Sequence, residues 1–221
     1  FKKIGGNIDV LTLTATPIPR TLQMSLLGIR NLSQLQTPPS SRMPIQTYVT
    51  EYNPHLAKEV ICRELSRGGQ VFYLYNLVST IFQKAEQIKK AIPNARVGVV
   101  HAKMDSEDID KIMTEFYLGN IDVLVCTSIV ESGLDVPNAN TILIENSDKF
   151  GLSQLYQIKG RVGRSNRVAY AYLFYNKNKE LTLEAEKRLK AIKEFASLGS
   201  GYKIAEKDLS IRGAGDILGS Q

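Results

Sequence analysis

The sequence predicts an α/β fold in which a parallel β-sheet is covered by helices on both faces. Several short segments are apolar at nearly every position, as strands buried on both faces are, among them residues 70–75 (QVFYLY) and 123–126 (VLVC). Stretches with helical periodicity separate these segments, and this alternation is typical of parallel βαβ units. The length of 221 residues allows one large domain, or one domain with an appendage.

The first part of the chain predicts one strand, one helix and a linker. Residues 10–14 (VLTLT) form a short β-rich run that ends at Ala15-Thr16-Pro17. A helix is expected over residues 19–27, because Pro19 suits the first turn of a helix. Residues 35–44 are rich in proline and serine and lack periodicity, so we expect a linker between two packing units there.

The middle of the chain predicts most of the sheet. Residues 45–49 alternate between apolar and more polar side chains, as a half-buried strand does. Pro54 begins a helix that runs to Arg67, where Gly68-Gly69 end it. The further elements expected are strands at 70–75, 97–100, 123–126, 141–144 and 169–174 and helices at 79–91 and 105–118.

Two of the expected helices are amphipathic. Residues 105–118 place four apolar side chains on one face and carry their acidic residues early, where the helix dipole favours them. Residues 181–198 form a long amphipathic helix among lysines and arginines, and residues 199–201 (GSG) end it. Residues 202–221 are punctuated by glycines, and we expect an irregular appendage there.

Composition excludes several classes of protein. No apolar run approaches the roughly 20 residues that span a bilayer, and residues 1–6 lack the apolar core of a secretory signal, so a cytoplasmic protein without a membrane partner is expected. The two cysteines, Cys62 and Cys126, are too far apart for a zinc motif and too few for a disulfide framework, and the chain has only two histidines. No metal site is therefore expected. The formal net charge of +6 suits a polyanionic partner, although many cytosolic proteins share it.

Three loops carry the residues that could take part in binding or catalysis. We expect these loops at the carboxyl ends of the strands, where ligands bind in open parallel sheets. They are residues 14–17 (TATP), residues 127–137 (TSIVESGLDVP) and residues 157–165 (QIKGRVGRS). Each has an ordinary reading: a plain turn, a strand-to-helix loop capped by Asp135, and a solvated basic helix end. Their order and their shared position argue against three ordinary loops.

The third loop contains the pattern Gly-Arg-x-Gly-Arg. On a helix, Arg161 and Arg164 would share one face, and the neighbouring glycines would let a polyanion approach the backbone. A guanidinium group pairs bidentately with phosphate oxygens and can neutralise charge on a transferred phosphoryl group. In the second loop, the hydroxyls of Thr127 and Ser128 could meet a phosphate and Asp135 could accept a hydrogen bond from a ribose hydroxyl.

These three loops resemble motifs III, V and VI of the superfamily 2 helicases, at residues 14–16, 127–135 and 157–164. Residues 71–76 are similar to motif IV, and residues 100–104 to the next strand end of that family. The resemblance implies the RecA-like fold of a second helicase domain, of the P-loop NTPase type.

Other segments resemble smaller groups within this superfamily. Residues 14–22 (TATPIPRTL) are similar to the RecG-like DNA translocases. Residues 28–42 (GIRNLSQLQTPPSSR) and 73–76 (YLYN) resemble the bacterial transcription-repair coupling factors within that group. Residues 208–219 (DLSIRGAGDILG) resemble the TRG motif that these translocases carry after the helicase core.

This family implies three parts in the chain. Residues 1–38 would be the end of a first RecA-like domain and a linker, residues 39–176 the second RecA-like domain, and residues 177–221 the TRG helical hairpin and loop. No Gly-x-x-x-x-Gly-Lys sequence and no Asp-Glu dipeptide occur. ATP and its Mg²⁺ would therefore be held mainly by the first motor domain, and we expect this chain alone to hydrolyse ATP negligibly.

The resemblance assigns five residues to ATP. Arg161 and Arg164 would reach the γ-phosphate in the closed state, with one or both as the arginine finger. Gln157, where many relatives have histidine, would help to couple the nucleotide to closure. Gly133 and Asp135 would lie near the ribose and the interdomain cleft.

A second set of residues would serve DNA and its coupling to ATP. Thr127 and Ser128 would contact a DNA phosphate, and His101 is a candidate for another such contact, although a packed or surface histidine is its more common role. Thr14 and Thr16 would couple the nucleotide state to DNA binding.

The C-terminal part would turn domain closure into movement along DNA. Arg212 matches the TRG arginine, whereas the glutamine of the motif would fall one residue beyond Gln221. The helix at 181–198 could contact DNA directly or pack with a solvated basic face.

The function implied is that of the C-terminal motor half of an ATP-dependent double-stranded DNA translocase. Such a protein displaces stalled RNA polymerase and couples transcription to nucleotide excision repair, and it meets the polymerase and the repair proteins through other domains. Two alternatives stay open: a RecG-type fork-reversal helicase, and a non-catalytic nucleic-acid-binding module.

Overall fold

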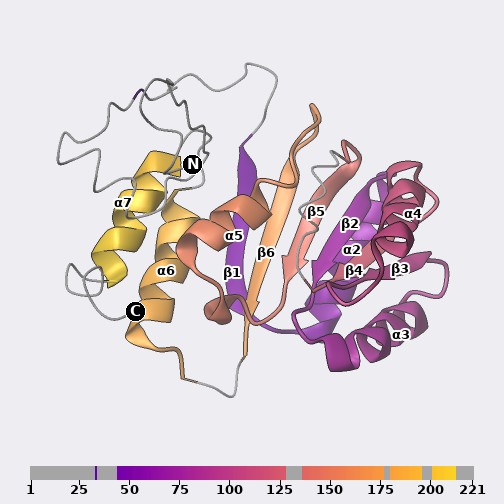
Figure 1. The fold of residues 1–221 in the computed structure, drawn as a ribbon, viewed down its shortest axis with the longest axis horizontal. Helices are drawn as coiled ribbons and strands as arrows, with labels where there is room; N and C mark the ends of the chain where they lie inside the picture. The colour runs from indigo at the N-terminus through magenta and orange to yellow at the C-terminus, as the bar shows by residue number, and fades with distance from the viewer. Residues whose placement is uncertain (1–32, 34–43, 128–135, 177–179, 196–200, 213–221) are drawn as a thin grey trace, which may run out of the picture.

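Six parallel strands form one sheet in the part of the chain that the computed structural model describes, namely residues 33, 44–127, 136–176, 180–195 and 201–212. The strand order is β1-β6-β5-β2-β4-β3, and every neighbouring pair is parallel (Figure 1). The bounds are β1 Ile45–Glu51, β2 Gln70–Leu74, β3 Val97–Val100, β4 Val123–Cys126, β5 Ala139–Ile144 and β6 Ala169–Tyr175.

Burial along the strands confirms the predicted parallel sheet. Every residue of β2, β4 and β5 is buried, because these three strands lie inside the sheet and have helices on both faces. Strand β1 lies at one end of the sheet, and its burial varies along its length as predicted.

Helices cover both faces of this sheet. Alternate strand residues contribute to two apolar clusters, one packed against α2 and α3 and the other against α4, α5, α6 and α7. Figure 1 shows α6 and α7 beside the β1 end of the sheet and α3 beside the β3 end. The bounds are α2 Pro54–Ser66, α3 Ile81–Ala91, α4 Ser106–Tyr117, α5 Leu152–Lys159, α6 Leu183–Glu194 and α7 Gly201–Arg212, with short 3-10 turns at Val78–Thr80 and Ser147–Lys149.

Local signals explain where the predicted helices begin and end. The Asn53 side chain accepts a hydrogen bond from the His55 amide and so caps α2, and Gly68 follows its C-terminus with φ of +75°. Thr182 caps α6 in the same way through the Ala185 amide. The expected strand at 10–14, helix at 19–27 and most of the linker at 35–44 lie outside the described residues.

One prediction about the C-terminal part is wrong. Residues 201–212 form helix α7 rather than an irregular segment. Ile204 and Ala205 are fully buried, and α7 packs against α5 and α6. In the described part of the chain, no helix combines the length and the apolar character needed to cross a membrane.

Candidate functional site

The predicted site residues lie at two opposite edges of the sheet. His101 and Thr127 directly follow β3 and β4, so they lie at the carboxyl edge. The segment 157–164 ends α5 and precedes β6, so it lies at the amino edge. A methyl group added at Gly163 would lie 3.1 Å from Ile45 Cγ1 and 3.2 Å from Ala169 Cβ, and these residues begin β1 and β6.

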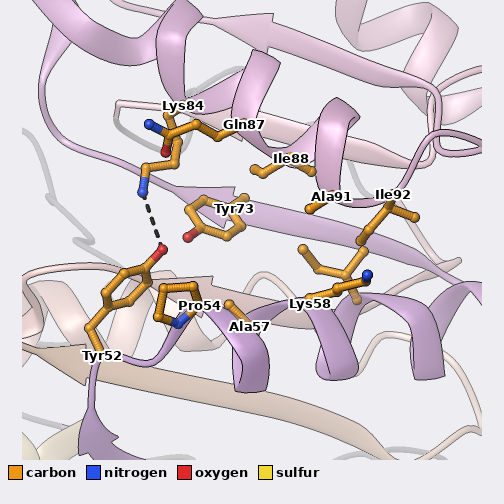
Figure 2. A pocket seen from close by; sticks show the side chains of 11 residues that line it. Tyr52, Pro54, Ala57, Lys58, Tyr73, Lys84, Gln87, Ile88, Ala91 and Ile92 are labelled. Atoms are coloured by element: carbon orange, nitrogen blue, oxygen red, sulfur yellow. Dashed lines mark hydrogen bonds between the residues drawn. The ribbon is translucent and has the colours of Figure 1, made fainter.

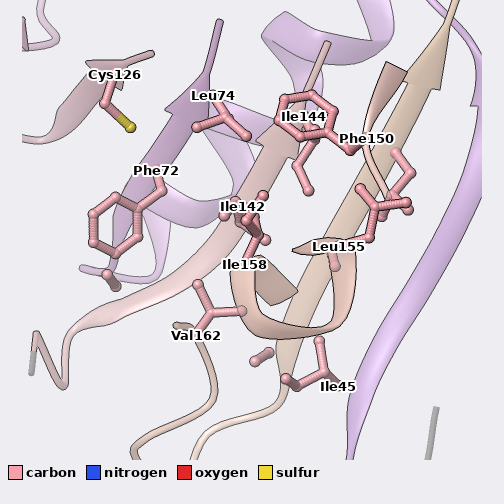
Figure 3. Close-up of a cluster of buried hydrophobic side chains, with 14 of the residues drawn as sticks. Ile45, Phe72, Leu74, Cys126, Ile142, Ile144, Phe150, Leu155, Ile158 and Val162 are labelled. Carbon is pink, nitrogen blue, oxygen red and sulfur yellow. The ribbon is translucent and has the colours of Figure 1, made fainter. Parts of the chain in front are cut away.

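The expectation that all three loops share the carboxyl edge is therefore wrong for the arginine-containing loop. Figure 3 shows the separation: Leu74, Cys126 and Ile144 end their strands at one side of the buried cluster, and Val162 and Ile45 lie at the other. The physical reason is the direction of α5, which carries the chain back across the sheet before β6 begins.

The two arginines lie on a turn and not on one helical face as predicted. Helix α5 has Gly160 as its C-cap, and Gly163 adopts φ of +73°. Between the arginines, Val162 is fully buried and anchors the turn in the core. Arg161 is half-buried and Arg164 is exposed. The turn thus fixes its backbone through Val162 and directs two cationic side chains out of the core.

We expect Gly163→Ala to lower the free energy of unfolding by about 2–3 kcal/mol, because the left-handed backbone costs about 1–3 kcal/mol without glycine and the added methyl meets two core side chains. Gly119→Ala is the matched control, since Gly119 has φ of +80° but no atom near the added methyl. Denaturant unfolding should show a smaller loss for the control. Equal losses would contradict tight packing at Gly163.

At the carboxyl edge, one hydrogen bond joins the Thr127 hydroxyl to the segment after β3, and a second lies within that segment. The Ala102 amide donates to Thr127 Oγ1 at 3.4 Å, and the Lys103 amide donates to His101 Nδ1 at 3.3 Å. His101 also contacts Phe82 edge-to-face, with ring centroids 5.7 Å apart. Thr127 is buried, at 4% exposure.

The remaining predicted site residues are placed only in part. Gln157 is exposed on α5, three residues before the turn that carries the arginines. Arg212 ends α7, but its side chain lies outside the described residues. Thr14, Thr16, Ser128, Gly133 and Asp135 also lie outside the described residues.

Sequence reasoning missed an ionic cluster at the carboxyl edge. Lys84 Nζ lies 2.7 Å from Glu145 Oε1, and the buried hydroxyl of Tyr73 donates a hydrogen bond to the same carboxylate oxygen. Burial and the charge of Glu145 hold the pKa of Tyr73 well above its usual value. Burial is the largest single influence on Lys84 and acts to lower its pKa, but the hydrogen bond and charge of Glu145, together with Tyr52, outweigh it and the pKa is raised.

This cluster closes one end of a pocket between α2 and α3. Figure 2 shows Tyr73 on the floor of the pocket, with Lys84 and Tyr52 joined by a 3.3 Å hydrogen bond at one end. The cavity has a volume of about 210 Å³ and its walls are mostly apolar. Tyr73 lies in the 71–76 segment that is similar to motif IV, but nothing in the sequence paired it with Lys84 or Glu145.

Sequence reasoning also missed Lys159, the last residue of α5. Lys159 is 3% exposed, and its Nζ donates to the Phe195 carbonyl at 3.2 Å and lies 5.6 Å from the centre of the Tyr156 ring. Burial lowers the pKa of Lys159 to about 8. The available signal was its position four and seven residues after Leu155 and Leu152, on the buried face of the helix.

We expect Lys159→Met to stabilise the fold at pH 7. A fall in pKa from 10.5 to about 8 corresponds to roughly 3 kcal/mol of burial free energy, and loss of one hydrogen bond offsets about 1 kcal/mol of the gain. Between pH 8 and 10.5 the unfolded lysine binds more protons than the folded one, so wild-type stability rises with pH in that window. Denaturant unfolding at pH 7 and pH 9.5 should show the variant's advantage shrinking. An advantage independent of pH would contradict a buried ammonium group.

The described residues contain no group of three metal-ligating side chains. Cys126 is buried in β4 as predicted, and burial raises the pKa of its thiol to about 12, which leaves it protonated and inert at neutral pH.

Comparison with known proteins assigns the family. The sequence profile of the helicase conserved C-terminal domain matches residues 54–166, slightly more than half of the chain. The chain belongs to this helicase family. Its six-stranded sheet is the RecA-like fold that was predicted.

Three similar proteins show how far the likeness extends. The transcription-repair-coupling factor of Bacillus subtilis (strain 168) is 59% identical over 221 residues, which are 100% of this chain and 19% of that protein. The structure of RecG bound to a three-way DNA junction matches with a TM-score of 0.75 and 35% identity, over 91% of this chain and 27% of that one. The Mss116p DEAD-box helicase domain 2, bound to an RNA duplex, shares the fold at a TM-score of 0.56 and 19% identity, over 67% of this chain and 60% of that one. The chain thus spans about one fifth of the length of the curated relatives it matches.

Proposed function

We propose that this helicase C-terminal domain is half of the motor of an ATP-dependent double-stranded DNA translocase that displaces stalled RNA polymerase and couples transcription to excision repair. In this proposal, residues 1–38 end the first motor domain, residues 39–176 form the second, and residues 177–221 form the TRG hairpin and loop. The observation that carries it is the 59% identity to a transcription-repair-coupling factor over the full 221 residues.

The amino edge of the sheet is the proposed nucleotide edge. Arg161 and Arg164 project from a turn whose backbone is fixed by buried Val162, and guanidinium groups match phosphate oxygens in geometry and charge. These residues would reach the γ-phosphate, with Gln157 beside them and Gly133 and Asp135 near the ribose. ATP with its Mg²⁺ supplies the phosphoryl group that is transferred, and the first motor domain would hold the metal.

The carboxyl edge is the proposed DNA edge. The Thr127 hydroxyl is fixed by the Ala102 amide, beside His101, so a phosphate could accept the hydroxyl proton there. Ser128 would add a second hydroxyl, Thr14 and Thr16 would relay the nucleotide state, and Arg212 would belong to the hairpin. Contacts of this kind read the DNA backbone, so affinity should fall with salt and depend little on sequence.

RNA polymerase and the excision-repair proteins would dock on other domains of the full-length protein. Because RecG is 35% identical over most of this chain, fork reversal is the second candidate function. The separating experiment gives the full-length protein ATP and either a stalled transcription complex or a model replication fork. Release of the polymerase without fork regression is the expected result. Fork regression without polymerase release would favour the RecG-type function, fork reversal.

A further inference from the structure

Helix α5, which precedes the arginine-containing turn, packs against the helix pair α6–α7, and a buried lysine at its end contacts α6. We propose that Lys159 is a positioning residue that couples the α6–α7 pair to Arg161 and Arg164, by holding the C-terminus of α6 against the end of α5. This inference rests on the proposed motor function and adds to it a residue of the 157–164 segment to which the resemblance assigned no role. Lys159 is not placed in contact with the nucleotide.

The first observation is where the ammonium group lies. Lys159 is the last residue of α5, two residues before Arg161, and its Nζ donates to the carbonyl of Phe195, the C-cap of α6. Lys159 therefore joins the last residue of α5 to the C-terminus of α6. Each C-terminus carries partial negative charge on its free carbonyls, so both helices favour a cation there.

The second observation is that α5 also holds α7. The Ser153 hydroxyl, near the start of α5, lies 3.3 Å from Oδ2 of Asp208, which is 2% exposed on α7. Helices α5, α6 and α7 pack against one another. Ser153 and Lys159 are six residues apart on one helix, about 9 Å at 1.5 Å per residue, so α5 contacts both helices of the pair along its length.

The third observation concerns the other charges at this interface. Arg188 on α6 donates to the Asp148 carbonyl, and Asp208 on α7 accepts from Ser153, so both lie toward the start of α5. Among the described residues, no acidic side chain forms an ion pair with Lys159. The partners of its ammonium group in the described part of the chain are the Phe195 carbonyl and the Tyr156 ring.

A buried ammonium group without an acidic partner destabilises a fold, and an apolar side chain of similar size would fit this site better. Its presence is explained if the contact serves movement rather than stability. A charge-assisted hydrogen bond between α5 and α6 is directional, so a shift of the arginine turn would pull the end of α6 with it. Since burial lowers the pKa of Lys159 to about 8, this contact should weaken as the pH rises through that value.

The test measures base pairs translocated per ATP hydrolysed by the full-length protein, between pH 7 and 9. Lys159→Met should keep DNA-stimulated ATP hydrolysis within about threefold, while base pairs moved per ATP fall about tenfold at pH 7, inside the usual 5–150-fold range of coupling between sites. The wild-type ratio should fall toward the variant's ratio at pH 9, and the variant's ratio should not change with pH. Lys187→Met removes an exposed lysine of α6 and should match wild type throughout.

Three results would overturn the proposal: an unchanged ratio in Lys159→Met, loss of ATP hydrolysis in that variant with DNA binding intact, or a wild-type ratio that is constant across the pH range. The last comparison needs only the wild-type protein, so it decides the question even if the variant does not fold. Lys159→Arg, which stays charged at pH 9, should keep the ratio of wild type at pH 7. Absence of DNA-stimulated ATP hydrolysis in wild type and Lys187→Met alike would instead refute the motor function itself.

Discussion

Arg161→Ala in the full-length protein is expected to reduce ATP turnover by about 10³–10⁵-fold, the range that an arginine finger contributes. The guanidinium group would be lost from the nucleotide edge, while Thr127 and His101 at the opposite edge of the sheet would be untouched. DNA binding without nucleotide should therefore persist. The measurements are steady-state ATP hydrolysis with saturating DNA, and DNA affinity in the absence of ATP.

Arg167→Ala is the matched control for this experiment. Arg167 is an exposed arginine in the same segment, and its guanidinium donates to the Arg67 carbonyl on the α2 side. Its loss should leave turnover close to that of wild type. If Arg161→Ala instead weakened DNA binding and kept turnover, the chain would be a nucleic-acid-binding module and the proposed role of the amino edge would be wrong.

Glu145→Ala is expected to lower the free energy of unfolding by about 3–5 kcal/mol, because it leaves a buried lysine without its partner. Lys84 and the hydroxyl of Tyr73 both depend on this carboxylate, and both side chains are largely buried. Denaturant unfolding followed by circular dichroism measures the loss.

One further variant separates charge from hydrogen bonding in this cluster, and another is an exposed control. Glu145→Gln keeps an acceptor for Tyr73 and should lose less than Glu145→Ala. Glu86→Ala removes an acidic residue from an exposed pair with Lys89 on the same helix as Lys84, and it should leave stability essentially unchanged. A loss for Glu145→Ala as small as that for Glu86→Ala would show that the cluster contributes nothing to the fold.

The parallel sheet was predictable because its central strands are buried on both faces and read as unbroken apolar runs, as in 70–75 and 123–126. Helix α7 was not. It begins at Gly201 and ends just before Gly213, and these glycines by themselves suggested irregular structure although the resemblance implied a helical hairpin, whereas its burial comes from contacts with α5 and α6.

The candidate site was predictable in its residues but not in its placement. The two arginines stood out through their glycine spacing, yet the rule for carboxyl ends of strands did not apply to them, because they follow a helix. Glu145 and Lys84 are distant in sequence, so no local pattern could join them. Lys159 sits at the C-terminus of α5, where lysine is common on the surface, and only the packed α6 shows that it is buried.

In the proposed motor, this domain lends cationic side chains to a nucleotide held by another domain. The most direct measurement is a structure of the full-length protein with duplex DNA and a transition-state analogue of ATP. We expect a guanidinium nitrogen of Arg161 or Arg164 to lie within about 3 Å of an oxygen in the γ-phosphate position. Both guanidinium groups turned away from the nucleotide and tied up in ion pairs within this domain would contradict it.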